Sequence, residues 1–294
     1  ADIYQYITEH GKKTGRHGKA AMKHAKCLNN KLKEFTGKEV LQMKMIDKSF
    51  LLRFIKFLQT TPTRGHLGLC KPKMLSQNSI HTYFTKLVTV LHCAYRDRLI
   101  PEDPTNFLQL EERTRKEHVE KVYLTEEELV KLTQTKCNNQ YVADIFLFSC
   151  LTGLRYSDII TLRWSELEAG PDGTIYLSKV QVKTQNKVGF PLPPSAIKLL
   201  PERKADNTLV FGKQFSHATV TNQVKGWCKR AGIGKHVTFH SARHTFATLI
   251  LTKGADLYTV SKLLGHTNIK TTHIYARVVE QSKQKAIDLL SGII

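Results

Sequence analysis

Apolar residues recur at helical spacing in three stretches of the first hundred residues. The first stretch covers residues 19–35. Asp47 and Ser76 stand where they can cap two further helices, because a short polar side chain accepts a hydrogen bond from a free helical N–H. The positions expected to be buried in these two helices are Phe50, Leu51, Phe54, Ile55 and Leu58, and then Ile80, Phe84, Leu87, Val88, Leu91 and Tyr95. The pattern predicts a small helical bundle over residues 1–110.

A densely charged segment, residues 111–122, follows this bundle and is expected to be an exposed linker. After it, Thr125 with Glu128 forms a capping box, and a buried helix is expected from Asn139 to Leu151. Two alternating stretches, 174–182 and 187–192, predict a β-hairpin, and helices return after Ser216. The expected fold is mostly α with a small β-sheet, and the second domain covers residues 123–294.

The charge balance narrows the possible partners. The chain of 294 residues has 45 Lys and Arg against 25 Asp and Glu, a net charge of +20. Residues 12–73 alone hold sixteen Lys and Arg against three acids. So many positive charges repel one another in the folded protein unless a polyanion binds to its surface. Double-stranded DNA is therefore the leading candidate partner and a membrane surface the second.

Other features of the composition bear on location. No run of eighteen apolar residues and no secretory signal is present, so a membrane span is not expected. None of the six cysteines forms a C-x-x-C pair, which favours a reduced, cytoplasmic protein, and DNA binding would place it at a bacterial nucleoid. The chain begins with Ala1 rather than Met, which leaves room for a preceding arm-binding domain.

Several residues of the second domain suit chemistry at an anion. Arg155 follows a turn at Gly153, and His240 and Arg243 share one face near a helix start. His240 and His244 also have the spacing of a zinc pair, but no carboxylate ligand stands near them, so no metal is expected and His244 is interpreted as a packing residue. His266 lies between Gly265, a C-cap, and Thr267, interpreted as an N-cap, and Tyr275 follows nine residues after His266.

Arg155, His240, Arg243, His266 and Tyr275, in that order, resemble the tyrosine recombinase (phage integrase) family. The matching stretches are TGLRYSD, HSARHTFAT and LGHTNIKTTHIYARV, within residues 119–294. Ala242 stands where the family usually has Leu, and Asp158 where Glu is common. The basic helices before residue 110 are similar to the family's SAM-like core-binding domain.

The resemblance implies cleavage and rejoining of DNA strands through a 3′-phosphotyrosine on Tyr275, with no cofactor. His240 would act as general base for Tyr275, and Arg155, Arg243 and His266 would bind the phosphorane oxygens. The family's general acid is a hairpin lysine, for which Lys183 before Thr184 is the best match. The resemblance also implies a tetramer on two DNA duplexes, with a host DNA-bending protein as a further partner.

Other functions stay open on the sequence. A type IB topoisomerase-like enzyme would use similar residues but relax supercoils as a monomer, and a non-catalytic regulator could keep the fold. A membrane-surface protein would need an amphipathic segment with a strong aromatic face, and the sequence shows none. Among recombinases, a mobile-element integrase and a chromosome-dimer resolvase both fit the length, and the other lysines of the hairpin, Lys179 and Lys187, are interpreted as general phosphate attraction or solvated charge.

Overall fold

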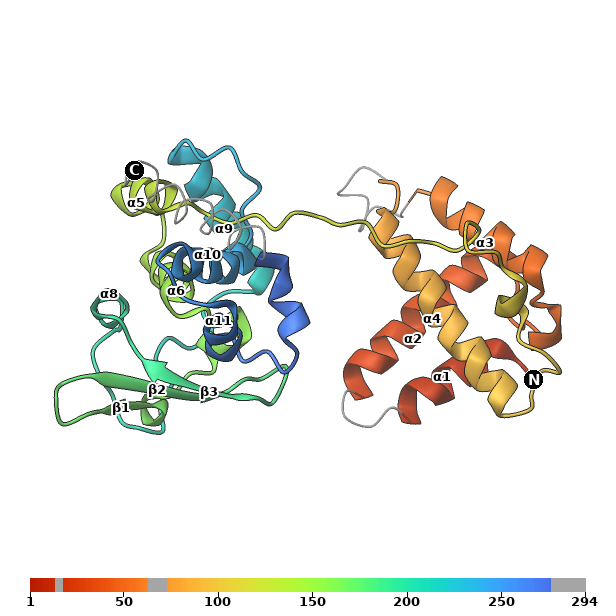
Figure 1. Ribbon diagram of the computed structural model, residues 1–294, viewed down its shortest axis with the longest axis horizontal. Coiled ribbons are helices and arrows are strands. Elements are labelled where there is room, and N and C mark those ends of the chain that lie inside the picture. The colour runs from red at the N-terminus through yellow and green to blue at the C-terminus, as the bar shows by residue number, and fades with distance from the viewer. Residues whose placement is uncertain (14–17, 63–72, 276–294) are drawn as a thin grey trace, which may run out of the picture. The chain divides into compact units, whose positions relative to one another are not determined.

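The computed structural model describes residues 1–13, 18–62 and 73–275 and divides into two compact units, residues 1–119 and 120–294 (Figure 1). The first unit is helical. Its elements are α1 (Ile3–Lys13), α2 (Gly18–Thr36), α3 (Lys48–Thr60) and α4 (Gln77–Arg96), with short 3-10 turns η2 (Met43–Met45) and η4 (Pro104–Phe107).

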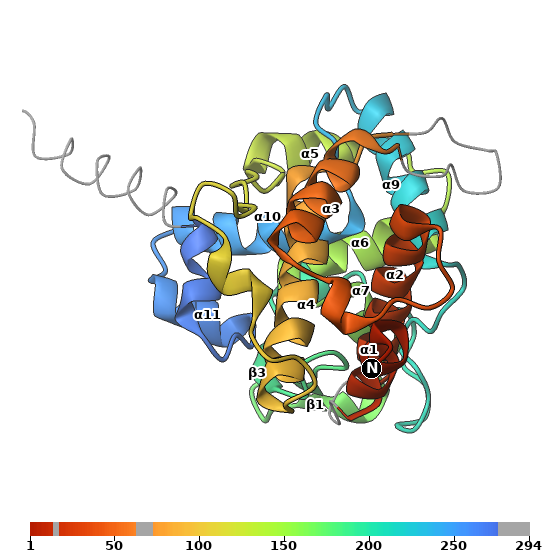
Figure 2. The ribbon, with the colours of Figure 1, turned by 90° about the vertical axis from the view of Figure 1, so that its right-hand side faces the viewer.

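Helices α3 and α4 of the first unit start where the sequence predicts, whereas α1 was not predicted. The carboxylate of Asp47 accepts a hydrogen bond from the backbone N–H of Phe50 at 2.6 Å, and the Ser76 hydroxyl caps α4 in the same way. The apolar stripes of these helices form one core, and α1 and α2 lie side by side (Figure 2). Tyr95 does not belong to that core: it is 49% exposed, because Ala94 takes the inward position and the next residue lies about 100° further around the helix.

The second unit contains seven helices among the described residues. They are α5 (Glu126–Gln134), α6 (Gln140–Thr152), α7 (Tyr156–Ile160), α8 (Pro194–Ile197), α9 (His217–Arg230), α10 (Phe239–Thr252) and α11 (Leu257–Leu263), with 3-10 turns η5 (Trp164–Glu166), η6 (Ile269–Thr271) and η7 (His273–Tyr275). The helix α6 is apolar on nearly every side and lies at the centre of the core, where α10 packs along it. The capping box at Thr125 and Glu128 starts α5, as predicted.

A three-stranded antiparallel sheet completes this unit. Its order is β1 (Leu167–Ala169), β2 (Ile175–Val180), β3 (Lys187–Pro191). Leu177 pairs with both Leu167 and Phe190, and these three side chains are buried, so one face of the sheet covers the core. The hairpin of β2 and β3 was predicted, whereas β1 was not, because three residues are too few to show an alternating pattern. The helix α11 packs against β3 (Figure 1).

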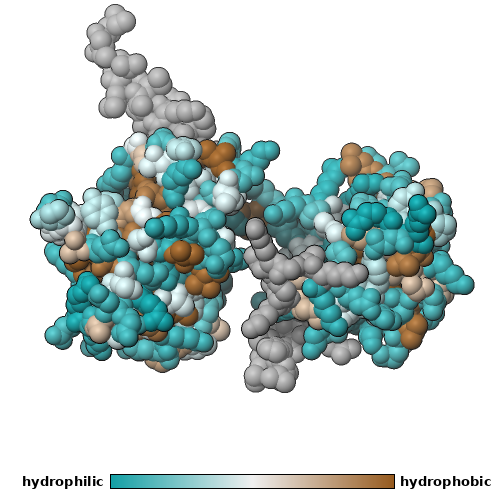
Figure 3. Space-filling view, turned by 90° about the horizontal axis from the view of Figure 1, so that it is seen from below, coloured by the Kyte–Doolittle hydropathy of each residue, from teal (hydrophilic) through white to brown (hydrophobic). Residues whose placement is uncertain are grey.

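The surface is mostly hydrophilic on the face shown in Figure 3. In the described part of the chain, we find no helix that is both long and apolar enough to cross a membrane.

Candidate active site

Arg155 is positioned by the sharp turn that joins α6 to α7. Gly153 ends α6 with φ of +69°, and a Cβ added there would lie 2.5 Å from the ring of Phe246, so only glycine fits. The turn brings Arg155 to the first position before α7, where its guanidinium donates to Oε1 of Gln181 at 2.8 Å. The carboxylate of Asp158, fully buried, lies 3.8 Å from the same guanidinium. Arg155 is thus held from two sides before any ligand arrives.

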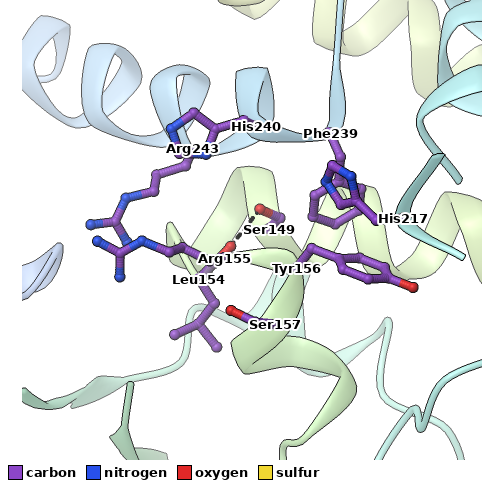
Figure 4. Close-up of a pocket in the computed structure, with 9 residues that line it drawn as sticks. All are labelled: Ser149, Leu154, Arg155, Tyr156, Ser157, His217, Phe239, His240 and Arg243. Atoms are coloured by element: carbon purple, nitrogen blue, oxygen red, sulfur yellow. Dashed lines mark hydrogen bonds between the residues drawn. The ribbon is translucent and has the colours of Figure 1, made fainter. Parts of the chain in front are cut away.

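Arg243 projects from α10 and is buried, with 3% exposure. Its guanidinium donates to the carbonyl oxygens of Gly153 at 2.8 Å and Leu264 at 2.6 Å. Burial and then the positive charge of Arg155 lower the pKa of Arg243 to about 9, which leaves it charged at neutral pH. The two guanidinium groups lie close together beside the cavity (Figure 4). Two like charges held together in this way favour an anion between them.

His266 follows Gly265, whose φ of +65° ends the turn after α11. Nε2 of His266 lies 3.1 Å from Nη2 of Arg243, and Nδ1 lies 2.8 Å from the hydroxyl of Thr272. Because a guanidinium only donates, Nε2 must accept, and Nδ1 therefore carries the proton. Burial, with the charges of Arg243 and Arg155, lowers the pKa of His266 to about 4, so the ring is neutral at pH 7. The cap of η6 is Asn268, not Thr267 as the sequence suggested.

His240 lies in the first turn of α10 on the surface of this cluster. Desolvation, followed by the positive charges of Arg243, Arg155 and Lys183, lowers the pKa of His240 to about 4. The ring is therefore an unprotonated base at neutral pH. It packs edge-to-face against the ring of His244 at 4.8 Å between centroids.

Tyr275 ends the described part of the chain and is buried, with 4% exposure. Its ring belongs to a small apolar cluster with Phe246 and Leu264. Nδ1 of His244 lies 2.6 Å from the Tyr275 hydroxyl, the one hydrogen bond that this hydroxyl makes within the described residues. Burial raises the pKa of Tyr275 to about 12, although the charge of Arg243 works against the rise.

His244 is the residue of this site that the sequence did not single out. It is buried, as a packing histidine should be, but its partner is the predicted nucleophile. Burial first, and then neighbouring charges, lower the pKa of His244 to about 3, so the ring is neutral and Nδ1 can accept the tyrosine's proton in a hydrogen bond. The spacing of His240 and His244 was the signal available, but it was considered only as that of a zinc pair, and His244 was interpreted as a packing residue.

The three hairpin lysines differ in their surroundings. Lys179 is 5% exposed and donates to the carbonyl of Thr161 at 2.9 Å and to the carboxylate of Glu166 at 2.8 Å. Its ammonium is therefore occupied inside the fold. Lys187 is exposed at the start of β3. Lys183 is exposed on the turn between the strands, and its charge acts on His240. Of the three, Lys183 is the lysine whose charge reaches the cluster.

A cavity of about 210 Å³ lies beside these groups (Figure 4). Arg155, His240 and Arg243 line one side, and the aromatic rings of Tyr156, His217 and Phe239 line the other. Within the described residues, no three His, Cys, Asp or Glu side chains gather as a metal site would require. The cavity therefore combines permanent positive charge with a neutral base, a combination that suits a phosphodiester.

Comparisons with known proteins agree with this arrangement. A model described as the phage integrase family matches residues 122–282, and one described as the phage integrase SAM-like domain matches residues 2–112. A tyrosine recombinase of Thermosipho africanus (strain TCF52B) is 28% identical over 283 residues, 94% of each chain. The tyrosine recombinase XerD of Listeria monocytogenes serotype 4b (strain F2365) is 26% identical over 246 residues, 76% of this chain and 79% of that protein.

Solved structures share the fold. A lambda integrase dimer bound to a COC′ core site matches with a TM-score of 0.70 and 17% identity over 95% of each chain. The Tn1549 transposon integrase in complex with transposon right end DNA matches with a TM-score of 0.73 and 19% identity, over 99% of this chain and 100% of the other. The helical unit, the sheet-bearing unit and the order of the site residues thus have one common explanation: the chain belongs to the phage integrase family, the tyrosine recombinases.

Proposed function

We propose that this protein is a site-specific recombinase that cleaves and rejoins duplex DNA through a covalent link between Tyr275 and a 3′-phosphate. The observation that carries the proposal is the pair of adjacent guanidinium groups, Arg155 and Arg243, in one cluster with His266 and a buried tyrosine. A scissile phosphate between the two guanidiniums would meet permanent, planar donors where charge grows in the transition state.

The reaction needs one proton removed and one supplied. Tyr275 attacks phosphorus, its proton leaves to a base, and the 5′-oxygen departs with a proton from an acid, so the phosphodiester's energy is kept in the tyrosyl ester. We propose His240 as the base, since it is neutral, open to solvent and set among the charges that would hold the phosphate. We propose Lys183 as the acid, because Lys179 is occupied by Glu166 and Thr161.

His244 has a different part in this scheme. In the DNA-free protein it holds the Tyr275 hydroxyl at 2.6 Å and keeps it neutral in an apolar cluster. We propose that a phosphate bound by Arg155 and Arg243 draws the hydroxyl toward the site, because a phosphate oxygen can accept its hydrogen bond. His266 supports Arg243 in the free state, and we propose that it turns a ring N–H toward the phosphate when DNA is bound.

The partners belong to the same proposal. The excess of Lys and Arg would supply phosphate contacts along a duplex, and these give affinity without sequence preference. Solved relatives of this fold include a lambda integrase tetramer bound to a Holliday junction. We propose that this chain likewise works as an oligomer on paired DNA sites at the bacterial nucleoid, with a DNA-bending host protein as accessory. We also propose that it is the integrase of a mobile genetic element.

Trapping the covalent intermediate tests the proposal. A nicked substrate loses the short 5′-ended strand after cleavage, so wild-type protein should accumulate a denaturant-resistant protein–DNA adduct. Tyr275→Phe should bind the same DNA with unchanged affinity and form no adduct, because it lacks only the nucleophilic oxygen. Tyr258→Phe is the matched control, since Tyr258 is 60% exposed on α11 and should leave the adduct intact. An adduct in Tyr275→Phe, or none in the wild type, would overturn the proposal.

A further inference from the structure

Gln181 is a fully buried amide at the point where β2 runs into the turn that carries Lys183. A buried amide is costly unless its oxygen and nitrogen find partners, so the groups that satisfy it show what it is built to hold. We infer that Gln181 is a positioning residue that locks Arg155, the Lys183 turn and the Leu264–Gly265 turn before His266 into one arrangement. The inference rests on the proposed function, which gives those groups their roles.

The side chain of Gln181 has three partners. Its Oε1 accepts from Nη1 of Arg155 at 2.8 Å and from the hydroxyl of Thr184 at 2.7 Å. Its Nε2 donates to the carbonyl oxygen of Leu264 at 3.0 Å. The orientation of the amide follows from chemistry, because a guanidinium can only donate and a carbonyl can only accept. Three segments distant in sequence therefore meet at one side chain.

The carbonyl of Leu264 extends the connection to the second arginine, since it also accepts from Arg243 at 2.6 Å. Both guanidiniums are thus joined through Gln181 and a single peptide oxygen. The next residue, Gly265, makes room for this contact: a Cβ there would lie 2.9 Å from Nε2 of Gln181 and 2.6 Å from Val188. Asn186, from the same turn as Lys183, donates to the carbonyl of Gly265 at 2.9 Å and so holds the turn close to the Leu264–Gly265 segment.

The turn that bears Lys183 is held by the same residue. The backbone N–H of Gln181 donates to Asn186, and its carbonyl accepts from the N–H of Gln185, each at 2.9 Å. On the other side, the N–H of Val182 donates to the buried carboxylate of Asp158 at 2.8 Å. With both neighbours of Lys183 held, the Lys183 backbone has little freedom, and the base of its side chain is fixed relative to Arg155.

An amide suits this place better than a carboxylate. A glutamate could accept from Arg155 and Thr184 equally well, but its charge would pair with the guanidinium and weaken its attraction for phosphate. Glutamine orients Arg155 and leaves its charge available. The structure therefore assigns two separable tasks to Gln181: holding the Lys183 turn, which needs hydrogen bonds, and holding Arg155 without neutralising it, which needs a neutral acceptor.

Two substitutions separate these tasks. Gln181→Met keeps the length and the backbone hydrogen bonds but removes every side-chain hydrogen bond, so both the turn and Arg155 should shift. Gln181→Glu keeps the two bonds to Oε1, but it adds a charge and replaces the donor to the Leu264 carbonyl by an acceptor. Gln185→Glu is the matched control: it adds the same charge to the same turn, on an exposed side chain that does not touch Arg155. It gives up the donors to the carbonyls of Gln181 and Val182, so it also controls for loss of hydrogen bonds at the turn surface.

Cleavage is measured on a normal nicked site and on one with sulfur in place of the bridging 5′-oxygen, which leaves without a proton. Gln181→Met should slow cleavage of the normal site by about 10²-fold, as a small misplacement of catalytic groups does. The sulfur substrate should recover the part of that loss that comes from Lys183, since it no longer needs a proton from that lysine. Gln181→Glu should slow both substrates by about 10²–10³-fold, as loss of a charge-stabilising donor does. Gln185→Glu should cleave both substrates at the wild-type rate.

Hydrogen exchange provides a readout that needs no activity. Amides of residues 182–186 and 265–266 should exchange at least tenfold faster in Gln181→Met than in wild type, whereas in Gln185→Glu those of residues 265–266 should exchange at unchanged rates. Unchanged exchange in Gln181→Met would overturn the inference even if wild-type protein forms no adduct. Equal sulfur rescue of Gln181→Met and Gln181→Glu would also overturn it, whereas failure of the wild type to form any adduct would count against the proposed function.

Discussion

Nδ1 of His244 lies 2.6 Å from the hydroxyl of Tyr275, in a buried contact between residues 31 positions apart. The contact places the tyrosine's proton against a neutral imidazole, because burial lowers the pKa of His244 to about 3 and raises that of Tyr275 to about 12. In this structure the tyrosine is thus protonated and held. The histidine expected to deprotonate it, His240, stands one turn earlier on α10, with its ring packed on that of His244.

Single-turnover cleavage should distinguish the two histidines. His240→Gln is expected to slow adduct formation by about 10²–10⁴-fold, the usual contribution of a general base. The loss should shrink as pH rises, because hydroxide can then take the tyrosine's proton. His244→Gln should slow cleavage much less, since it removes the contact that holds the hydroxyl and leaves the proposed base in place. The measurement is the adduct rate of each variant between pH 6 and 9.

The opposite result would exchange the roles. If His244→Gln shows the large loss with the steep pH dependence and His240→Gln does not, the residue in contact with Tyr275 is itself the base. His240 would then bind the phosphate rather than deprotonate Tyr275.

Acid should destabilise the second unit through its buried histidines. The pKa of His244 is lowered to about 3 and that of His266 to about 4, from an ordinary value of 6.5, so the folded state favours the neutral rings. This contribution to stability is complete above pH 6.5 and is lost as the pH falls toward 4 and then 3, because the unfolded chain takes up protons first. The melting temperature should therefore fall steadily from pH 7 to pH 4.

The variant His244→Phe checks that origin. It should melt lower than wild type at pH 7, since a hydrogen bond worth about 1 kcal/mol is gone. It should also lose less of its melting temperature between pH 7 and pH 4, since one of the titrating groups has been removed. Equal pH dependence in the two proteins would show that His244 does not carry this effect.

Lys179 and Lys183 should fail in different ways when replaced by methionine. Lys179→Met leaves Glu166 and the carbonyl of Thr161 without their partner, so the free energy of unfolding should fall by about 1–3 kcal/mol. Lys183→Met changes an exposed turn and should alter stability by no more than about 0.5 kcal/mol. Its cleavage rate should nevertheless fall by about 10²–10⁴-fold, with recovery on the bridging-sulfur substrate.

Urea unfolding and adduct formation, measured on the same preparations well below the melting temperature, provide the comparison. If Lys179→Met is as stable as wild type and is rescued by sulfur, the acid is Lys179, and the pair with Glu166 must open when DNA binds.

The sequence predicted best those features that depend on neighbouring residues. The caps at Asp47, Ser76 and Thr125 lie within three residues of the N–H groups that they satisfy, so the local pattern was enough. The set Arg155, Lys183, His240, Arg243, His266 and Tyr275 came from resemblance, and its roles stay predictions.

What the sequence could not supply is the choice of partners across the fold. Gln181 finds Arg155 and Leu264, 26 and 83 residues away, and His244 finds Tyr275. Nothing near Gln181 in sequence distinguishes it from the exposed Gln185. Such contacts depend on how α7, the hairpin and α11 pack against one another. The spacing of apolar residues, every 2 residues in a strand or 3.6 in a helix, carries no information about that packing.

Limited trypsin digestion tests the junction between the two units. Residues 111–122 were expected to be one exposed linker, but the structure ties its first half to α4. His81 contacts the carbonyl and hydroxyl of Thr114 at 2.9 and 3.0 Å, and Asn78 makes two hydrogen bonds with the backbone of Glu117, at 2.9 and 3.0 Å. A protease needs several residues of free backbone around the bond that it cuts.

Among the described lysines and arginines, we therefore expect the first cut after Lys121 rather than after Arg115 or Lys116. Asn78→Ala releases the backbone at Glu117, so this variant should gain an early cut after Lys116 while the cut after Lys121 keeps its rate. Mass spectrometry of the first fragments identifies the sites. First cuts inside α2, α4 or α6 would contradict the division into two units. An early cut after Arg115 in the wild type would show that the contacts with Asn78 and His81 do not hold the segment in solution.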